Sequence, residues 1–157
     1  CDLTLNNRVK WSTTRLTWKQ HIKAKIQQIK FKAQEINWLI GRSSKLSLYN
    51  KVMLYKCIIK PVWTYGIELW GCASKSNIVM MQRCQNKILR NIVKAPWYIT
   101  NHAIHKDFNI PYVTDVIKDR SSIYLSKIEC HYNQLITSLI GSSSPRRLKR
   151  CWPSDLK

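Results

Sequence analysis

The sequence predicts an all-α protein, a bundle of about four long helices with shorter helices between them. Apolar residues recur three or four positions apart through most of the chain, which places them along one side of a helix. They make up 45% of the 157 residues, enough for a modest core. No convincing strand pattern occurs, and only residues 1–11 are compatible with a short, frayed β element.

The first helix is expected between Thr17, a suitable N-cap, and Gly41, a suitable stop. Its apolar stripe consists of Trp18, Ile22, Ile26, Ile29, Ala33, Ile36 and Ile40. Lysines border the stripe, with Lys19, Lys23 and Lys30 on one side and Lys25 and Lys32 on the other. A helix of about 24 residues spans about 36 Å, so we expect it to pack along other long helices.

The second helix is expected to start at Ser43 or Ser44 and to kink or end at Pro61. Its apolar seam consists of Leu48, Val52, Tyr55 and Ile59, with Leu46, Tyr49 and Met53 beside it. The third helix is expected from an N-cap at Ser74 or Ser76 to the residues before Pro96. Its apolar side consists of Ile78, Met81, Cys84 or Gln85, Ile88 and Ile92.

The C-terminal part predicts a short helix after Thr100 and a last long helix from the residues after Thr114 to Gly141. The apolar side of the long helix consists of Ile117, Tyr124, Ile128, Leu135 and Leu139. Residues 142–157 contain the run RRLKR, and we expect them to form a mobile basic tail.

Residues 61–71, PVWTYGIELWG, join the second and third helices. They are dense in large apolar side chains that we expect to be buried, namely Trp63, Tyr65, Ile67, Leu69 and Trp70. We expect a buried structural corner here, in which glycines allow a tight turn and close packing. Its residues are Trp63, Tyr65, Gly66, Glu68, Trp70 and Gly71. Glu68 is expected to pair with a basic side chain or to stand at a helix start. Base stacking by Trp63 or Trp70 is the alternative to core packing.

The charge is strongly one-sided. Lys and Arg number 27 against 8 Asp and Glu, a formal net charge of +19, and Glu35 is the only acid from Leu3 to Ile67. Such an excess is typical of a chain that meets a polyanion, and nucleic acid is the favoured partner. An anionic membrane surface and simple solubility are the alternatives.

Four cations fall on one face of the third helix, and four more lie in the tail. The helix contributes Arg83, Lys87, Arg90 and Lys94, and the tail Arg146, Arg147, Lys149 and Arg150. Like charges at helical spacing repel each other, and an aligned row of phosphates would offset that repulsion. A solvated face without a ligand is the alternative. Together with Lys19, Lys23 and Lys30, these residues are the predicted nucleic-acid contacts.

No catalytic centre or cofactor site is visible in the sequence. A polymerase or nuclease needs clustered carboxylates, and the eight acids here are dispersed. His102 and His105, with Cys130, His131 and Cys151, lack the spacing of a zinc finger. The six cysteines form no C-x-x-C pair, and neither a signal peptide nor a membrane span is present. We therefore expect a reducing intracellular location, nuclear or cytoplasmic, with no membrane partner.

Four stretches in order carry a resemblance to a known family. They are RLTWKQHI (15–22), LYKCIIKPVWTYGIELWG (54–71), QRCQNKILRNIVKAPWY (82–98) and HYNQLITSLIGSSSPRRLKRCWPSDL (131–156). They resemble the segment after the catalytic domain in reverse transcriptases of non-LTR retrotransposons, the jockey type above all. The resemblance covers nearly the whole chain.

The resemblance implies a thumb and C-terminal extension that grips an RNA–DNA template–primer duplex. It divides the chain into a remnant of the palm-to-thumb junction (1–14), a thumb-like domain (15–98), a helical extension (99–141) and the tail (142–157). The fingers, the palm carboxylates and their Mg²⁺ would belong to the longer protein, so the chain is expected to be inactive alone. Residues 9–22, VKWSTTRLTWKQHI, depart from the family pattern VKYLGVxLDxRLTWxxHI. A helical protein-interaction module is the alternative function.

Overall fold

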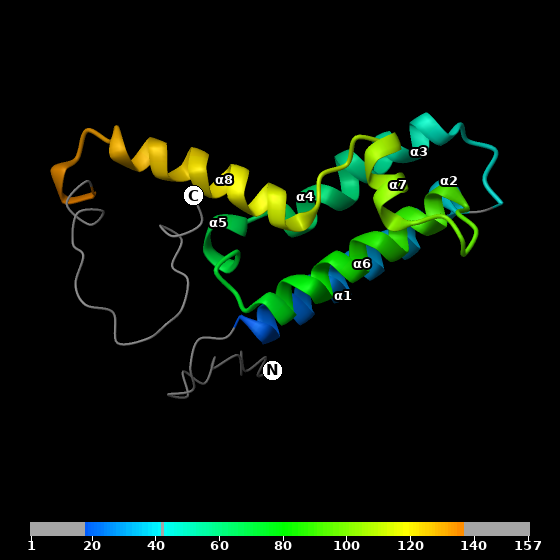
Figure 1. The fold of residues 1–157 in the computed structure, drawn as a ribbon, viewed down its shortest axis with the longest axis horizontal. Coiled ribbons are helices and arrows are strands. Elements are labelled where there is room, and N and C mark those ends of the chain that lie inside the picture. Colours follow the sequence, from blue (N-terminus) through cyan, green and yellow to red (C-terminus); the bar gives the residue numbers. More distant parts are fainter. Residues whose placement is uncertain (1–17, 42, 137–157) are drawn as a thin grey trace, which may run out of the picture.

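The protein is all-helical over the residues that its structure, a computed structural model, describes, namely 18–41 and 43–136 (Figure 1). In order the elements are α1 (Lys19–Glu35), α2 (Asn37–Ile40), α3 (Leu48–Leu54), the π-helical turn η1 (Tyr55–Ile59), α4 (Lys60–Thr64), α5 (Ile67–Trp70), α6 (Lys75–Val93), α7 (Asn101–Asp107) and α8 (Val113–Glu129). The predicted all-α class is confirmed. The β element expected within residues 1–11 and the basic tail lie outside the described residues.

The apolar stripe of the first helix is confirmed, but the helix is not continuous. Ile22, Ile29 and Ile40 are buried in the core. A turn at Ile36 separates α1 from α2, and the Leu39 amide donates to the Ile36 carbonyl at 2.9 Å, a tight i→i+3 bond. Gly41 is needed for space rather than for a left-handed stop, because a β-carbon there would collide with the Asn37 carbonyl.

The second helix begins later than predicted, at Leu48. Ser44 is used in a local turn, in which its hydroxyl accepts from the Leu46 amide at 3.1 Å. Ser47 is the N-cap instead, and its hydroxyl accepts from the Asn50 amide at 3.3 Å. Both serines compete for nearby amides, and the sequence pattern does not decide which of them starts the helix.

Pro61 does not end this helix, which continues from residue 48 to residue 64. The preceding turn η1 is π-helical, and the Lys60 amide donates to the Tyr55 carbonyl, five residues back. Pro61 has no amide hydrogen, so it cannot donate the next backbone hydrogen bond of the helix. The wider π-helical turn therefore lies directly before the position that lacks a donor. Val52, Tyr55 and Ile59 of the predicted seam are buried.

The expected corner is present around α5, with two exceptions. Trp63, Ile67 and Trp70 are buried, whereas Tyr65 and Leu69 are 78% and 56% exposed. The prediction was wrong for these two because they alternate with the buried residues around the turn. The ammonium group of Lys25 instead lies over the Tyr65 ring, 5.0 Å from the ring centroid, in a cation–π contact.

The glycines of the corner have the two roles expected of them. Gly66 has φ 66°, which favours glycine, and Gly71 lies against α8, where a β-carbon would be 2.8 Å from Ile117 Cγ2. Glu68 is half-buried in the first turn of α5. The chain thus turns at Gly66 and packs closely at Gly71.

Helix α6 starts at the predicted cap Ser74 and stops at Val93, where Lys94 takes a left-handed conformation with φ 56°. Most of its predicted apolar side is buried, namely Ile78, Met81, Cys84, Gln85 and Ile92. Ile88 is only partly buried, and Leu89, which was not predicted, is buried. Helix α7 follows the cap Thr100, whose hydroxyl accepts from the Ala103 amide at 3.2 Å, as expected.

The last helix, α8, is shorter than predicted and ends at Glu129 rather than Gly141. After it, the Asn133 amide donates to His131 Nδ1, and the Asn133 side chain accepts from the Leu135 amide where helical backbone resumes at residues 134–136. The C-terminal half of α8 extends past α5 (Figure 1), so Tyr124 and Leu135 are exposed rather than buried as predicted. Leu139 lies outside the described residues.

Candidate nucleic-acid interface

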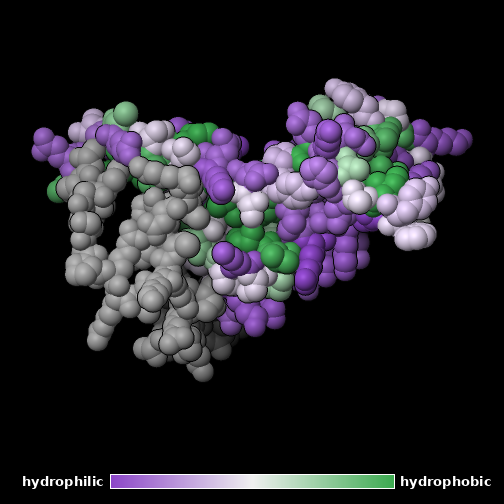
Figure 2. Space-filling model, in the orientation of Figure 1, coloured by the Kyte–Doolittle hydropathy of each residue, from purple (hydrophilic) through white to green (hydrophobic). Residues whose placement is uncertain are grey.

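Helices α1 and α6 pack side by side and run in the same direction (Figure 1). Their apolar faces meet the core, where Ile22 and Ile29 of α1 and Met81 and Ile92 of α6 are buried. Hydrophilic side chains gather along the middle of the pair in the view of Figure 2, beside a patch of hydrophobic ones. Polar residues of the pair are therefore exposed on that face.

Exposed cations of both helices lie in the neighbourhood of Cys84. This thiol is buried, which raises its pKa, while the ammonium groups of Lys30 on α1 and Lys87 on α6 oppose the rise. Each helix therefore contributes one cation near Cys84. The other exposed cations of these two predicted faces are Lys19, Lys23, Arg83 and Lys94.

These cations are not neutralised by acids of the described chain. Within residues 18–41 and 43–136, the one salt bridge is between Lys32 and Glu35, 2.8 Å apart on the opposite border of α1. Between Glu68 and Asp107 the sequence contains no acid at all. Within the described residues, the exposed cations of the two predicted faces thus have no salt-bridge partner.

Arg90 differs from its three predicted partners because its guanidinium is occupied internally. It donates to the Ile99 carbonyl at 2.7 Å, the Pro96 carbonyl at 2.8 Å and Asn101 Oδ1 at 3.0 Å, with a longer contact to the Trp97 carbonyl at 3.4 Å. The arginine thus organises the loop after α6. The four predicted tail cations, Arg146, Arg147, Lys149 and Arg150, lie outside the described residues.

The aromatic residues available to a ligand are not the ones considered from the sequence. Trp63 and Trp70 are 2% and 1% exposed, so neither ring can stack on a base. Trp97 and Tyr98, in the loop after α6, are 90% and 69% exposed. The helical periodicity of the sequence did not single them out, although their position between Pro96 and the helix cap Thr100 indicates a turn.

The histidines considered as metal ligands serve the packing of α7. His105 is buried, with Nδ1 2.7 Å from the Ile110 carbonyl oxygen and its ring stacked on Tyr112 at 4.2 Å. His102 Nδ1 lies 3.3 Å from the Tyr112 hydroxyl. In the part of the chain that the structure describes, no three His, Cys, Asp or Glu side chains form a cluster fit for a metal.

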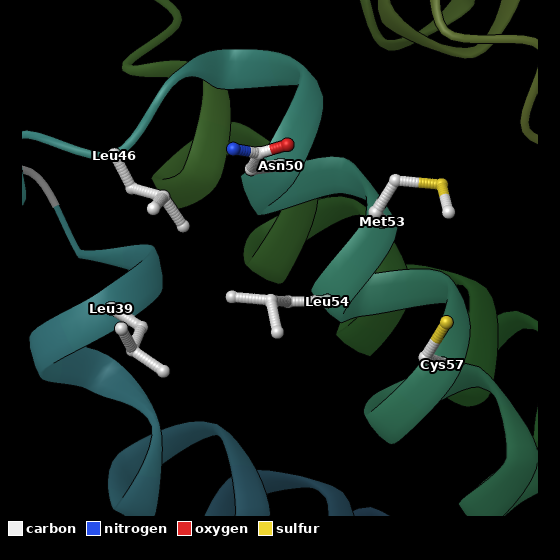
Figure 3. A pocket seen from close by; sticks show the side chains of 6 residues that line it. All are labelled: Leu39, Leu46, Asn50, Met53, Leu54 and Cys57. Atoms are coloured by element: carbon white, nitrogen blue, oxygen red, sulfur yellow. The ribbon is translucent and has the colours of Figure 1, made fainter.

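A second surface is apolar. A hollow of about 360 Å³ opens between α2 and the run from α3 to η1, and Leu39, Leu46 and Leu54 point toward one another across it (Figure 3). Its lining also includes Asn50, Met53 and Cys57. Trp38 and Tyr49, on α2 and α3, are 72% and 73% exposed. Exposed apolar surface of this kind is typical of a contact with another protein.

Known proteins similar to this chain are transposon polymerases. The chain is 39% identical over 142 residues to the probable RNA-directed DNA polymerase from transposon X-element of Drosophila melanogaster, and 35% identical over 136 residues to that from transposon BS of the same fly. It is 35% identical over 150 residues to the RNA-directed DNA polymerase from mobile element jockey of Drosophila funebris. These alignments cover 87–90% of this chain. The chain matches a segment of the jockey-like reverse transcriptases.

The resemblance expected from the four sequence stretches is thereby confirmed. The jockey-like segment spans only 15–16% of the length of the curated relatives it matches. No family model and no solved structure matches it. Among the described helices, none combines the length and the apolar character required to cross a membrane.

Proposed function

We propose that this jockey-like segment binds the RNA–DNA template–primer duplex of a transposon reverse transcriptase and performs no catalysis by itself. One observation supports the proposal most directly: α1 and α6 pack together, and the exposed cations of their two predicted faces, Lys30 and Lys87 among them, form no salt bridge within the described residues. The relatives are named as RNA-directed DNA polymerases, so RNA and DNA are the polyanions that we expect at this surface.

The spacing of the cations suits a phosphate backbone. Residues four apart on a helix are about 6 Å apart along its axis, and each strand of a duplex carries a charge about every 3.4 Å. Lys19 and Lys23, or Arg83 and Lys87, can therefore face different phosphates of one strand. Such contacts fix the position of a duplex without reading its sequence.

The proposal keeps the exposed predicted contacts and gives Arg90 the role of holding a loop. The contacts are Lys19, Lys23, Lys30, Arg83, Lys87 and Lys94, with the tail residues as further candidates. Mg²⁺ and the reacting carboxylates belong, by this proposal, to the palm of the longer protein, as the similarity to RNA-directed DNA polymerases implies.

The test is the affinity of the whole 157-residue chain for a fluorescent RNA–DNA hybrid, measured by anisotropy over a range of salt concentrations. We expect steep weakening with salt, and Lys30→Glu, Arg83→Glu and Lys87→Glu together should lower affinity at least about tenfold and reduce the salt slope by about two to three. The matched control reverses the exposed Lys32, Lys45 and Lys106, which changes the net charge equally.

An equal loss in the control set would show a general charge effect and contradict the proposed surface. Affinity that does not change with salt would contradict phosphate binding altogether. Circular dichroism of both variants checks that the helices are intact.

A protein-interaction module is the second candidate, and the hollow lined by Leu39, Leu46 and Leu54 favours it. The partner would be the palm and fingers of the longer polymerase. Hybrid binding that survives reversal of Lys30, Arg83 and Lys87 would favour this function over the first. Under the first function, Met53→Glu at the hollow leaves hybrid affinity unchanged.

A further inference from the structure

The loop between α6 and α7 carries two aromatic side chains away from the core. Trp97 is 90% exposed and Tyr98 is 69% exposed, and the two rings meet edge to face with centroids 6.0 Å apart. The loop stands at the C-terminal end of the basic helix α6 (Figure 1). A tryptophan ring is among the largest apolar groups in proteins, so its exposure to solvent often indicates a binding surface.

The exposure comes from a well-anchored turn. The Ile99 amide donates to the Pro96 carbonyl at 3.2 Å, so Trp97 and Tyr98 are the two central residues of a β-turn. Arg90 donates to the carbonyls of Pro96 and Ile99, at 2.8 and 2.7 Å, and so holds both ends of that turn. The two rings are therefore presented outward by a fixed backbone.

The anchoring continues on the core side of the loop. Ala95 and Ile99 pack against the hydrophobic core, and the Ala95 amide donates to the Arg90 carbonyl at 3.1 Å. Residues on either side of the aromatic pair are thus tied down, while the pair itself is not covered by the described chain. A preorganised aromatic surface loses little entropy when a ligand binds.

The surroundings of the pair are polar and cationic. Lys94, Thr100, Asn101 and His102 are all exposed next to it, and no acid occurs between Glu68 and Asp107. A protein-docking face would be expected to continue in apolar residues, as at the hollow near α3. Aromatic rings among cations are instead typical of surfaces that stack the bases of single-stranded nucleic acid.

We propose that Trp97 and Tyr98 form a stacking platform for unpaired nucleotides that adjoin the duplex held by α1 and α6. This inference rests on the proposed function and adds a second ligand class to it, an unpaired strand. Lys94, exposed at the end of α6, would contact the phosphate of the stacked nucleotide. Stacking is tolerant of sequence, because every base has a π-face.

The experiment compares two probes on the whole chain: a blunt RNA–DNA hybrid, and the same hybrid extended by a short unpaired RNA strand that carries 2-aminopurine. We expect the extended hybrid to bind about tenfold more tightly than the blunt one and its 2-aminopurine fluorescence to be quenched. Trp97→Ala should remove both effects and leave the blunt affinity unchanged. Trp97→Phe, which keeps a ring, should retain most of the gain.

The matched control is Trp38→Ala, which removes a tryptophan of similar exposure, 72%, from α2. It should leave both probes unaffected. Reversal of the charges of Lys30, Arg83 and Lys87 should weaken the binding of both probes equally. A loss of affinity for the blunt hybrid therefore tests the duplex-binding surface and not the aromatic pair. If blunt binding is absent from the parent chain, the unpaired strand alone is used, and Trp97-dependent quenching still supports the platform.

Equal affinity of the parent chain for the two probes would overturn the inference. So would a Trp97→Ala chain that retains the gain and the quenching, because the pair would then face a protein rather than a base.

Discussion

Gly71, directly after α5, lies so close to Ile117 of α8 that a β-carbon at Gly71 would be 2.8 Å from Ile117 Cγ2. It would also be 2.6 Å from the Ile67 carbonyl oxygen. The absence of a side chain therefore allows α8 to pack on the corner. This contact joins α8 to the corner between α4 and α6.

Gly71→Ala is expected to lower the free energy of unfolding by about 1–3 kcal/mol, because the core has no room for the methyl group. Urea denaturation of Gly71→Ala, Ile117→Ala and the double variant measures the effect. The double variant should lose less unfolding free energy than the two single variants lose together, by at least about 0.5 kcal/mol. Gly66→Ala is the control: it strains a positive φ but meets no neighbour within 4 Å, so its loss should add to that of Ile117→Ala.

Trp70→Ala is expected to lower the free energy of unfolding by about 3–5 kcal/mol, as large buried aromatics do. Trp70 is 1% exposed, and its indole N–H donates to the Tyr65 carbonyl at 3.4 Å. Trp97→Ala removes an equal side chain from a 90% exposed position and should change stability by less than about 0.5 kcal/mol. Equal melting curves for the two variants would contradict the assignment of Trp70 to the core.

Arg90→Lys is expected to destabilise the chain by about 1.5–3 kcal/mol although the charge is retained. A single ammonium cannot reach the acceptors on Pro96, Ile99 and Asn101 that the planar guanidinium bonds together. Thermal denaturation of Arg90→Lys beside Arg83→Lys tests this. Arg83 is exposed on the same helix face, so its replacement should have an effect below about 0.5 kcal/mol.

Tyr55 is expected to make stability fall at high pH. Burial raises the pKa of its hydroxyl to about 12, with nearby polar groups of Gln85 and Trp63 opposing the rise. Because the unfolded phenol ionises near pH 10, the contribution is complete below pH 10 and is lost as pH rises toward 12. The loss of unfolding free energy attributable to Tyr55 should be on the order of 1 kcal/mol at pH 11.

The measurement for this prediction is urea denaturation of the parent chain and of Tyr55→Phe at several pH values from 9 upward. Tyr55→Phe should lose less stability over that range, since it has no phenol to ionise. If the unfolding free energies of the two chains fall in parallel as pH rises, ionisation of Tyr55 is not the cause of the loss. Tyr49→Phe, at an exposed position, is the control and should follow the parent.

The sequence by itself determined the helical class, the buried stripes of α1 and α6, and the resemblance to jockey-like reverse transcriptases. These features are local, because apolar periodicity and a cap such as Thr100 act within one helix. Pro61 and the serines before α3 show the limit of such signals, since π-helical bonds and competing side-chain acceptors shift the boundaries.

Only the tertiary structure decided which side chains are available. Arg83 and Arg90 share one predicted face, yet the loop after α6 occupies Arg90 and leaves Arg83 exposed. Trp70 and Trp97 are equally apolar, yet α5 and α8 bury one while a β-turn presents the other. The reason is physical: periodicity fixes the direction of a side chain about its own helix, but exposure depends on which distant segments pack against it.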